Sequence, residues 1–153
     1  MGNIEVDKKT IYTTRQLVIH YAETKGEMVQ LDDPAAVYKF LKPKLQFQPE
    51  EVFIVVALNK DNGIAGWRET ARGTASDTII HPREIFKFVY LCNATGFILA
   101  HNHPSGECKP SDDDIVTTAK VAELADIHLL NFLDHIIIGY KNYFSMKAGG
   151  YIK

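Results

Sequence analysis

The chain has 153 residues, 46% hydrophobic and 24% charged, the composition of an ordinary globular protein long enough to bury a core without disulfides or a structural metal. Its 17 basic and 19 acidic residues give a formal net charge of −2, so no overall positive field favours indiscriminate nucleic-acid binding. Only two cysteines occur, no signal segment opens the chain, and no apolar run approaches the ~18 residues of a membrane span. We therefore expect one cytoplasmic domain over residues 1–153, with no membrane partner.

Hydrophobic patterning predicts an α/β fold. The expected elements, in chain order, are a strand at 16–22, a helix at 34–42, strands at 51–59 and 64–75, a helix opening at 81–84, a strand at 96–100, a helix at 111–126, and one or two closing strands within 128–139 and 143–147. Helices alternate with strands, yet one hairpin is clearly signalled. The pattern therefore favours an α/β/α sandwich around a mixed, hairpin-containing central sheet.

Local signals in the first half set several of these boundaries. Asp32-Asp33-Pro34 combines a capping carboxylate with proline at the first helical position. The helix that follows is expected to bury one stripe of side chains: Val37, Phe40 and Leu41. The continuous apolar run 51–59 indicates a strand covered on both faces. Asp61-Asn62-Gly63 then offers the positive-φ residues of a tight hairpin turn.

The stretch from His101 to Asp114 (HNHPSGECKPSDDD) carries the chemistry. Alternate side chains of a strand share a face, so His101 and His103 project to the same side, where two imidazoles can grip one cation at the ~2.0–2.1 Å that zinc prefers. Asp114 lies in the first turn of the next helix, from which its carboxylate can point back toward the strand end. Two histidines and one carboxylate leave a fourth tetrahedral position for water, whose pKa falls to ~7 on zinc. The pattern predicts a catalytic zinc site.

An interpretation without a metal stays open at this stage. Ser111 and Asp114 form the S-x-x-D pattern of a helix capping box, and the two histidines could be hydrogen-bonded residues at a strand end. Capping by Ser111 does not exclude metal binding by Asp114. Because both patterns fall within one span of 14 residues, the coincidence favours the metal.

The same run resembles the pattern H-x-H-P-x6-S-x2-D of the JAB/MPN (JAMM) metalloprotease superfamily. With the segments LN, GT, HPREIF, AHNHPSG, PS, DHIIIG and Tyr143-Phe144-Ser145, the chain is similar to the bacterial RadC family over roughly residues 51–148, and residues 1–50 would be an N-terminal extension of the same domain. The resemblance implies a JAB/MPN-like fold, similar to that of cytidine deaminases. It also implies a zinc ion bound by His101, His103 and Asp114, and a metallopeptidase-type or isopeptidase-like hydrolase acting on a peptide or protein.

The superfamily also uses a glutamate at the head of an apolar strand as general base and then acid, and a serine as oxyanion donor. Glu51, directly before VFIVVALN, matches the first position and Ser111 the second, so the resemblance implies catalytic roles for both. Glu50 is the nearest competitor, and spacing alone does not separate the two glutamates. Without a metal, Glu51 would be a solvated glutamate at a strand end.

The resemblance is weak upstream of residue 51. Full-length RadC proteins carry a helix-hairpin-helix region before this domain, so the family's traditional link to DNA repair loses here the element most expected to touch DNA. No inserted segment of the kind that eukaryotic-type relatives use to hold ubiquitin is evident. The alternative function is a DNA-repair-associated or nucleic-acid-associated factor without peptidase activity. Its basic patch would comprise Lys39, Lys42, Lys44, Lys60, Arg68 and Arg72, although scattered solvated charge is the simpler interpretation.

Other reactive residues receive smaller roles. Cys108 could complete a His2Cys site but nothing constrains its loop, and Cys92, on an apolar helix, is expected in the core. Asp134-His135 could orient a metal ligand, or could be a structural pair at a strand start. The remaining histidines have no acidic or thiol partner at ligand spacing: His20, His81 and His128.

Overall fold

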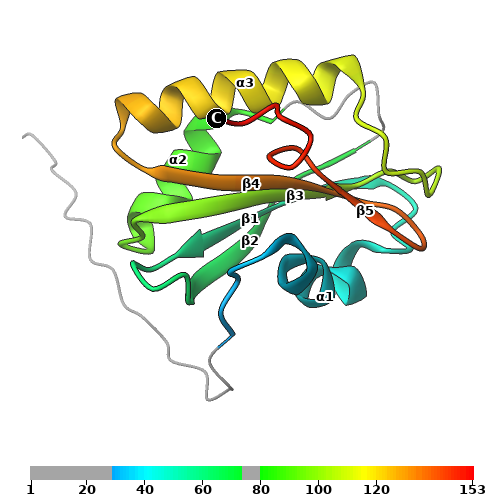
Figure 1. Ribbon diagram of the computed structural model, residues 1–153, viewed down its shortest axis with the longest axis horizontal. Helices are drawn as coiled ribbons and strands as arrows, with labels where there is room; N and C mark the ends of the chain where they lie inside the picture. Colours follow the sequence, from blue (N-terminus) through cyan, green and yellow to red (C-terminus); the bar gives the residue numbers. More distant parts are fainter. Residues whose placement is uncertain (1–28, 74–79) are drawn as a thin grey trace, which may run out of the picture.

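A computed structural model describes residues 29–73 and 80–153 of the chain. They form a five-stranded sheet in the order β2-β1-β3-β4-β5, with α1 against one face and α2 and α3 against the other (Figure 1). In chain order the elements are α1 (Pro34–Leu45), β1 (Glu51–Leu58), β2 (Ile64–Gly73), α2 (Pro82–Leu91), β3 (Gly96–Asn102), α3 (Asp112–Ile127), β4 (Asn131–Ile138) and β5 (Tyr143–Ser145). This confirms the predicted α/β/α layers, while the strand predicted at 16–22 lies outside the described residues.

The sheet is mixed, as the hairpin signal predicted. Strand β1 pairs antiparallel with β2 and with β3. Strand β3 pairs parallel with β4, to which α3 connects it along the chain, and β4 pairs antiparallel with β5. In the β1–β3 pair Phe53 lies opposite His101, so the first residues of β1 and the last residues of β3 lie at the same end of the strands. Because α3 starts after β3 at the same end of the strands, this topology brings Glu51, His101 and the N-terminus of α3 together.

The two faces of the sheet have separate cores. On one face, alternate residues of β1 and β4 pack against a stripe of α1, which comprises Val37, Leu41 and Leu45. On the other face, Val55 of β1 and Leu99 of β3 pack against α2 and α3. All eight residues of β1 are buried, which confirms the prediction of a strand covered on both faces.

Helix α1 is longer than predicted. It runs through Pro43 to Leu45 instead of ending near residue 42, and Leu45 replaces Phe40, which is only partly buried, in the buried stripe. Pro43 removes a single backbone hydrogen bond near the end of the helix. Burial of Leu45 and the hydrogen bond from the Gln46 amide to the Lys42 carbonyl continue the helix past it.

The connection from β1 to β2 spans 59–63. Asn62 alone of the predicted turn residues has positive φ (56°), whereas Gly63 does not. The side chain of Asn59 closes the loop by accepting hydrogen bonds from the Asp61 and Gly63 amides. A Cβ at Gly63 would meet the Asn59 side chain at 2.9 Å, so the glycine is needed for close approach and not for its φ.

The remaining differences are shifts of boundaries. The closing strand begins at Asn131 and not at residue 128, because His128 caps α3 and Leu129 turns the chain with φ of 55°. Strand β3 extends two residues beyond the predicted 96–100, to Asn102, and β5 ends at Ser145 because the chain turns there. Strand β2 is described to Gly73, and the last residues of the predicted 64–75 lie outside the described chain.

Candidate metal centre

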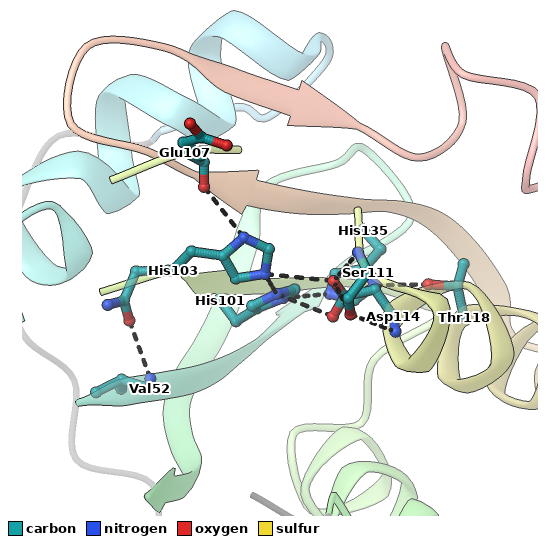
Figure 2. A network of polar contacts seen from close by, with 9 residues as sticks. Val52, His101, His103, Glu107, Ser111, Asp114, Thr118 and His135 are labelled. Atoms are coloured by element: carbon teal, nitrogen blue, oxygen red, sulfur yellow. Dashed lines mark hydrogen bonds and ion pairs between the residues drawn. The ribbon is translucent and has the colours of Figure 1, made fainter. Parts of the chain in front are cut away.

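Three side chains, from β3, the residue after it and α3, meet where β3 ends beside the first turn of α3 (Figure 2). His101 Nε2 lies 3.0 Å from His103 Nε2 and 3.1 Å from Asp114 Oδ1, and His103 Nε2 lies 3.3 Å from Asp114 Oδ2. His101 is fully buried, and Asp114 is 5% exposed. Within residues 29–73 and 80–153, these three form the group of His, Cys, Asp or Glu that could hold a metal ion. The structure thus brings together the three predicted ligands.

Local structure directs each of these side chains. His101 lies near the end of β3 and His103 directly follows the strand, two residues on, so both rings lie on the α3 face of the sheet. Ser111 is the N-cap of α3: its hydroxyl accepts from the Asp114 amide at 3.1 Å and donates to Asp114 Oδ2 at 2.7 Å. The Ser111 amide donates to the same oxygen at 2.8 Å. The predicted capping box is therefore present, and it turns the Asp114 carboxylate toward the histidines.

The second nitrogen of each imidazole is already engaged. His103 Nδ1 lies 3.0 Å from the Glu107 carbonyl oxygen, which can only accept, so Nδ1 carries the hydrogen. His101 Nδ1 lies 2.8 Å from His135 Nε2. With a hydrogen on both Nδ1 atoms, two Nε2 lone pairs and a carboxylate converge on one point. Neutral imidazole nitrogens and a carboxylate are ligands that zinc accepts, so the donor set fits the ion.

The charges at the centre suit a cation. Burial opposes ionisation of Asp114, yet with no metal bound, hydrogen bonds with His101, His103 and Ser111 outweigh this cost and hold the pKa of its carboxyl well below the usual value. The hydrogen bond with Asp114 raises the pKa of His103, whereas burial lowers the pKa of His101. Asp114 is therefore an anion at neutral pH, which is the form that binds a metal.

The two neighbouring glutamates differ in their surroundings. Glu51 is 8% exposed and lies two residues before Phe53, whose ring stacks on His101 at 4.3 Å. Burial raises the pKa of Glu51, with the nearby charge of His103 opposing and that of Asp114 adding to the shift. Glu50 is exposed, and its carboxylate lies 3.6 Å from Arg72 Nη1. The two glutamates therefore differ: Glu51 is buried beside the converging residues and influenced by their charges, whereas Glu50 is exposed and paired with Arg72.

The profile of the RadC-like JAB domain family matches residues 31–151, most of the chain. The chain belongs to this family. The match confirms the family predicted from the motifs. It also extends upstream of residue 51, where the motifs were weak, to include α1.

Curated relatives of this RadC-like JAB domain are proteins named UPF0758, a name that states no activity. One from Staphylococcus haemolyticus is 35% identical over 131 residues, which cover 86% of this chain and 58% of the relative. Others from Gloeothece citriformis and Methanosarcina mazei are 40% and 37% identical over 80% and 81% of this chain, and 50% and 54% of their own lengths. The chain thus spans about half the length of these relatives.

Asn102 is a site residue of this RadC-like domain that the sequence did not single out. It lies between the two histidines, is 1% exposed, and accepts at Oδ1 from the Val52 amide at 2.9 Å. Its Nδ2 donates to the Glu50 carbonyl at 3.0 Å. These bonds clamp the peptide groups on both sides of Glu51 to the end of β3. The strand alternation that predicted the histidines also places Asn102 on the opposite side, which was the available signal.

The Asp134-His135 pair is divided between the two faces of the sheet. His135 is fully buried on the α3 side, where its two ring nitrogens contact His101 and Thr118. Asp134 instead accepts hydrogen bonds from the Ser145 hydroxyl and the Lys147 amide. His135 thus contacts one of the three converging residues, whereas Asp134 contacts the turn after β5, and the two do not act as one structural pair.

The loop after His103 is held from the far side by Tyr140. The Tyr140 hydroxyl donates to the Pro104 carbonyl at 2.6 Å, and its amide donates to the Gly106 carbonyl at 2.9 Å. Gly106 has φ of 81°, and a Cβ there would collide with the Tyr140 ring. The predicted glycine and proline loop thus owes its shape to a residue after β4.

The two cysteines are free thiols outside the centre. Cys108 packs beside Ile137, Met146 and Ile152, so its placement gives no support to a His2Cys site. Cys92, expected in the core, instead caps α2 and is only partly buried. His128 contacts the Tyr90 hydroxyl through Nδ1 at 2.7 Å.

Several basic side chains proposed as a patch have local partners. Arg72 bonds Glu69 at 2.8 Å, Lys60 lies 3.8 Å from Asp61, and Lys44 Nζ lies over the Trp67 ring at 4.6 Å. These contacts agree with scattered surface charge. In the part of the chain that the structure describes, every helix is too short or too polar to cross a membrane.

Proposed function

We propose that this RadC-like JAB domain is a zinc-dependent hydrolase that cleaves an amide or isopeptide bond in a peptide or protein. The convergence of His101 Nε2, His103 Nε2 and the Asp114 carboxylate carries the proposal. Catalytic zinc sites use three protein ligands of these types, whereas structural sites use four. A cytoplasmic site of action is part of the proposal and is supported by the two free cysteines.

Zinc held by these residues would supply Lewis-acid polarisation of the scissile carbonyl and activation of a water molecule. The protein must then provide a proton acceptor, because the attacking water loses protons during the reaction. Glu51 suits this role in our proposal. Its burial raises the pKa of the carboxyl, which makes the carboxylate a stronger base, and Asn102 fixes the backbone on both sides of it. Glu51 would then return the proton to the leaving nitrogen.

Ser111 would bind the oxyanion that develops on the substrate. Its hydroxyl hydrogen points to Asp114 Oδ2, so donation to substrate requires that hydrogen to turn away. Asp114 would keep the hydrogen bond from the Ser111 amide during this turn. Ser111→Ala should lower kcat about 10²–10³-fold, as for other oxyanion donors, while Ser111→Thr, which keeps a hydroxyl, should lower it less.

The test compares two adjacent glutamates in zinc-loaded protein. A peptide library is screened with the wild-type chain, and kcat is then measured on a responsive substrate for Glu51→Gln and Glu50→Gln. We expect about one equivalent of zinc in all three proteins, a loss of about 10²–10⁴-fold in kcat for Glu51→Gln, and little change for Glu50→Gln. Equal rates for Glu51→Gln and wild type would overturn the assignment of the base. A zinc-loaded wild-type chain that cleaves no peptide or isopeptide would overturn the proposed activity.

A further inference from the structure

Behind the candidate metal centre lies a buried chain of three side chains. His101 Nδ1 is 2.8 Å from His135 Nε2, and His135 Nδ1 is 2.7 Å from the Thr118 hydroxyl (Figure 2). All three residues have 0% relative exposure. No bulk water can therefore replace a partner that is removed, and each of these polar atoms depends on its neighbour in the chain.

The hydrogen-bonded row of His101, His135 and Thr118 has two consistent arrangements of hydrogens, because a neutral imidazole donates through one nitrogen and accepts through the other. In the first, His101 Nδ1–H donates to His135 Nε2, and His135 Nδ1–H donates to Thr118. This leaves the His101 Nε2 lone pair facing Asp114 Oδ1, 3.1 Å away. In the second, every hydrogen bond is reversed and His101 Nε2 carries the hydrogen, so it cannot bind a metal. The positions of the hydrogens along this row thus decide whether His101 can be a ligand.

We propose that His135 is a positioning residue for the metal centre. Held by Thr118, it accepts the Nδ1 hydrogen of His101 and so presents the Nε2 lone pair of His101 to the ion. The proposal rests on the zinc site of the proposed function, and it adds a determinant of zinc affinity that lies behind the ligands.

The fold holds this relay, the hydrogen-bonded row of His101, His135 and Thr118, in place from three sides. Asp114 and Thr118 are four residues apart on α3, so they share one face of the helix and reach His101 and His135 respectively. In the parallel β3–β4 pair His135 lies opposite Leu99, two residues before His101, so His135 is the diagonal neighbour of His101 on the same face of the sheet. Phe53 closes the relay from β1, with its ring 4.3 Å from the His101 ring and 5.9 Å from the His135 ring.

The experiment uses two variants of similar shape that differ in their hydrogen-bonding atoms. His135→Gln can offer an amide oxygen near the position of Nε2, whereas His135→Met has a similar length and offers no comparable acceptor. Zinc affinity is measured by competition with a chromogenic chelator. We expect His135→Met to weaken zinc binding about 10–100-fold, and His135→Gln to weaken it by less than about tenfold. Asp134→Asn, on the other face of the same strand, should leave zinc affinity unchanged.

Equal zinc affinities for His135→Gln and His135→Met would overturn the proposal, because the volume of the side chain, and not its hydrogen bond, would then account for any effect on zinc binding. Should His135→Met fail to fold, Thr118→Val and Thr118→Ser repeat the comparison one step back, with weakening expected only for valine. Nitrogen-15 NMR of the His101 ring gives a readout independent of activity: zinc-loaded wild type should carry its hydrogen on Nδ1, and a hydrogen on Nε2 would contradict the relay. A wild-type chain that binds zinc without cleaving peptides would sink the proposed activity and leave this inference standing.

Discussion

The two faces of the sheet bury polar groups in different ways. On the α1 face, Asp134 is surrounded by donors: the Ser145 hydroxyl and the amides of His135 and Lys147 all point at its oxygens. On the α3 face, two imidazole nitrogens and the Asp114 carboxylate face one another at 3.0–3.3 Å. The donors around Asp134 tie a chain turn together, whereas Asp114, which also accepts from Ser111, adjoins two imidazole nitrogens with which it could hold a cation. The partners of a buried carboxylate, and not its burial, therefore distinguish a structural role from a role in metal binding.

The largest expected effect separates two adjacent aspartates in the first turn of α3. Asp114→Ala should lower zinc affinity by more than about a hundredfold, exceeding what the loss of an outer partner costs, because it removes a ligand. Asp113→Ala is the matched control: Asp113 is exposed, and its loss should leave one equivalent of zinc bound. Metal analysis after chelator competition makes the measurement. Zinc retained by Asp114→Ala at wild-type affinity would erase the difference between the faces.

A substitution in the α1-face core should change folding without changing the metal. Ile136 is fully buried among aliphatic side chains, so Ile136→Ala should lower the free energy of unfolding by about 2–5 kcal/mol. Val116 is 66% exposed, and Val116→Ala should change it by less than about 0.5 kcal/mol. Urea denaturation of the metal-free proteins gives these values. A tenfold fall in the zinc affinity of folded Ile136→Ala would show that the faces are coupled.

The smallest expected effect comes from removing one hydroxyl on each face. Ser145→Ala takes a donor from Asp134, and Thr118→Val takes the partner of His135. Each should lower the free energy of unfolding by about 1–3 kcal/mol, because each leaves a buried polar atom unpaired. Zinc affinity should fall only in Thr118→Val. Chelator competition on both variants checks this, and a similar fall in Ser145→Ala would contradict the division of roles.

The convergence of His101, His103 and Asp114 was predictable because it depends on local rules. Alternation along a strand placed His101 and His103 together, and the S-x-x-D pattern placed Asp114 at the start of a helix. The contacts of His135 and Asn102 were not predictable in this way. They depend on which strands pair and in which register, and sequence spacing carries no record of that.

Helix ends were misjudged for a related reason. Pro43 is a stop signal in isolation, yet α1 passes it because Leu45 is buried against the sheet. The run from His128 to Leu130 looks like the start of a strand, but it caps α3 and turns the chain through Leu129. In both places tertiary packing outweighed local preference, which the sequence alone could not weigh.

Zinc K-edge X-ray absorption on protein loaded with one equivalent of zinc tests the central claim most directly. Zinc held by His101, His103 and Asp114 should show scattering from two imidazole nitrogens at about 2.0–2.1 Å and from a carboxylate oxygen at about 2.0–2.2 Å. A sulfur scatterer near 2.3 Å would instead point to Cys108, and a spectrum without imidazole scattering would remove His101 and His103 as ligands. Either result would contradict the metal centre described above.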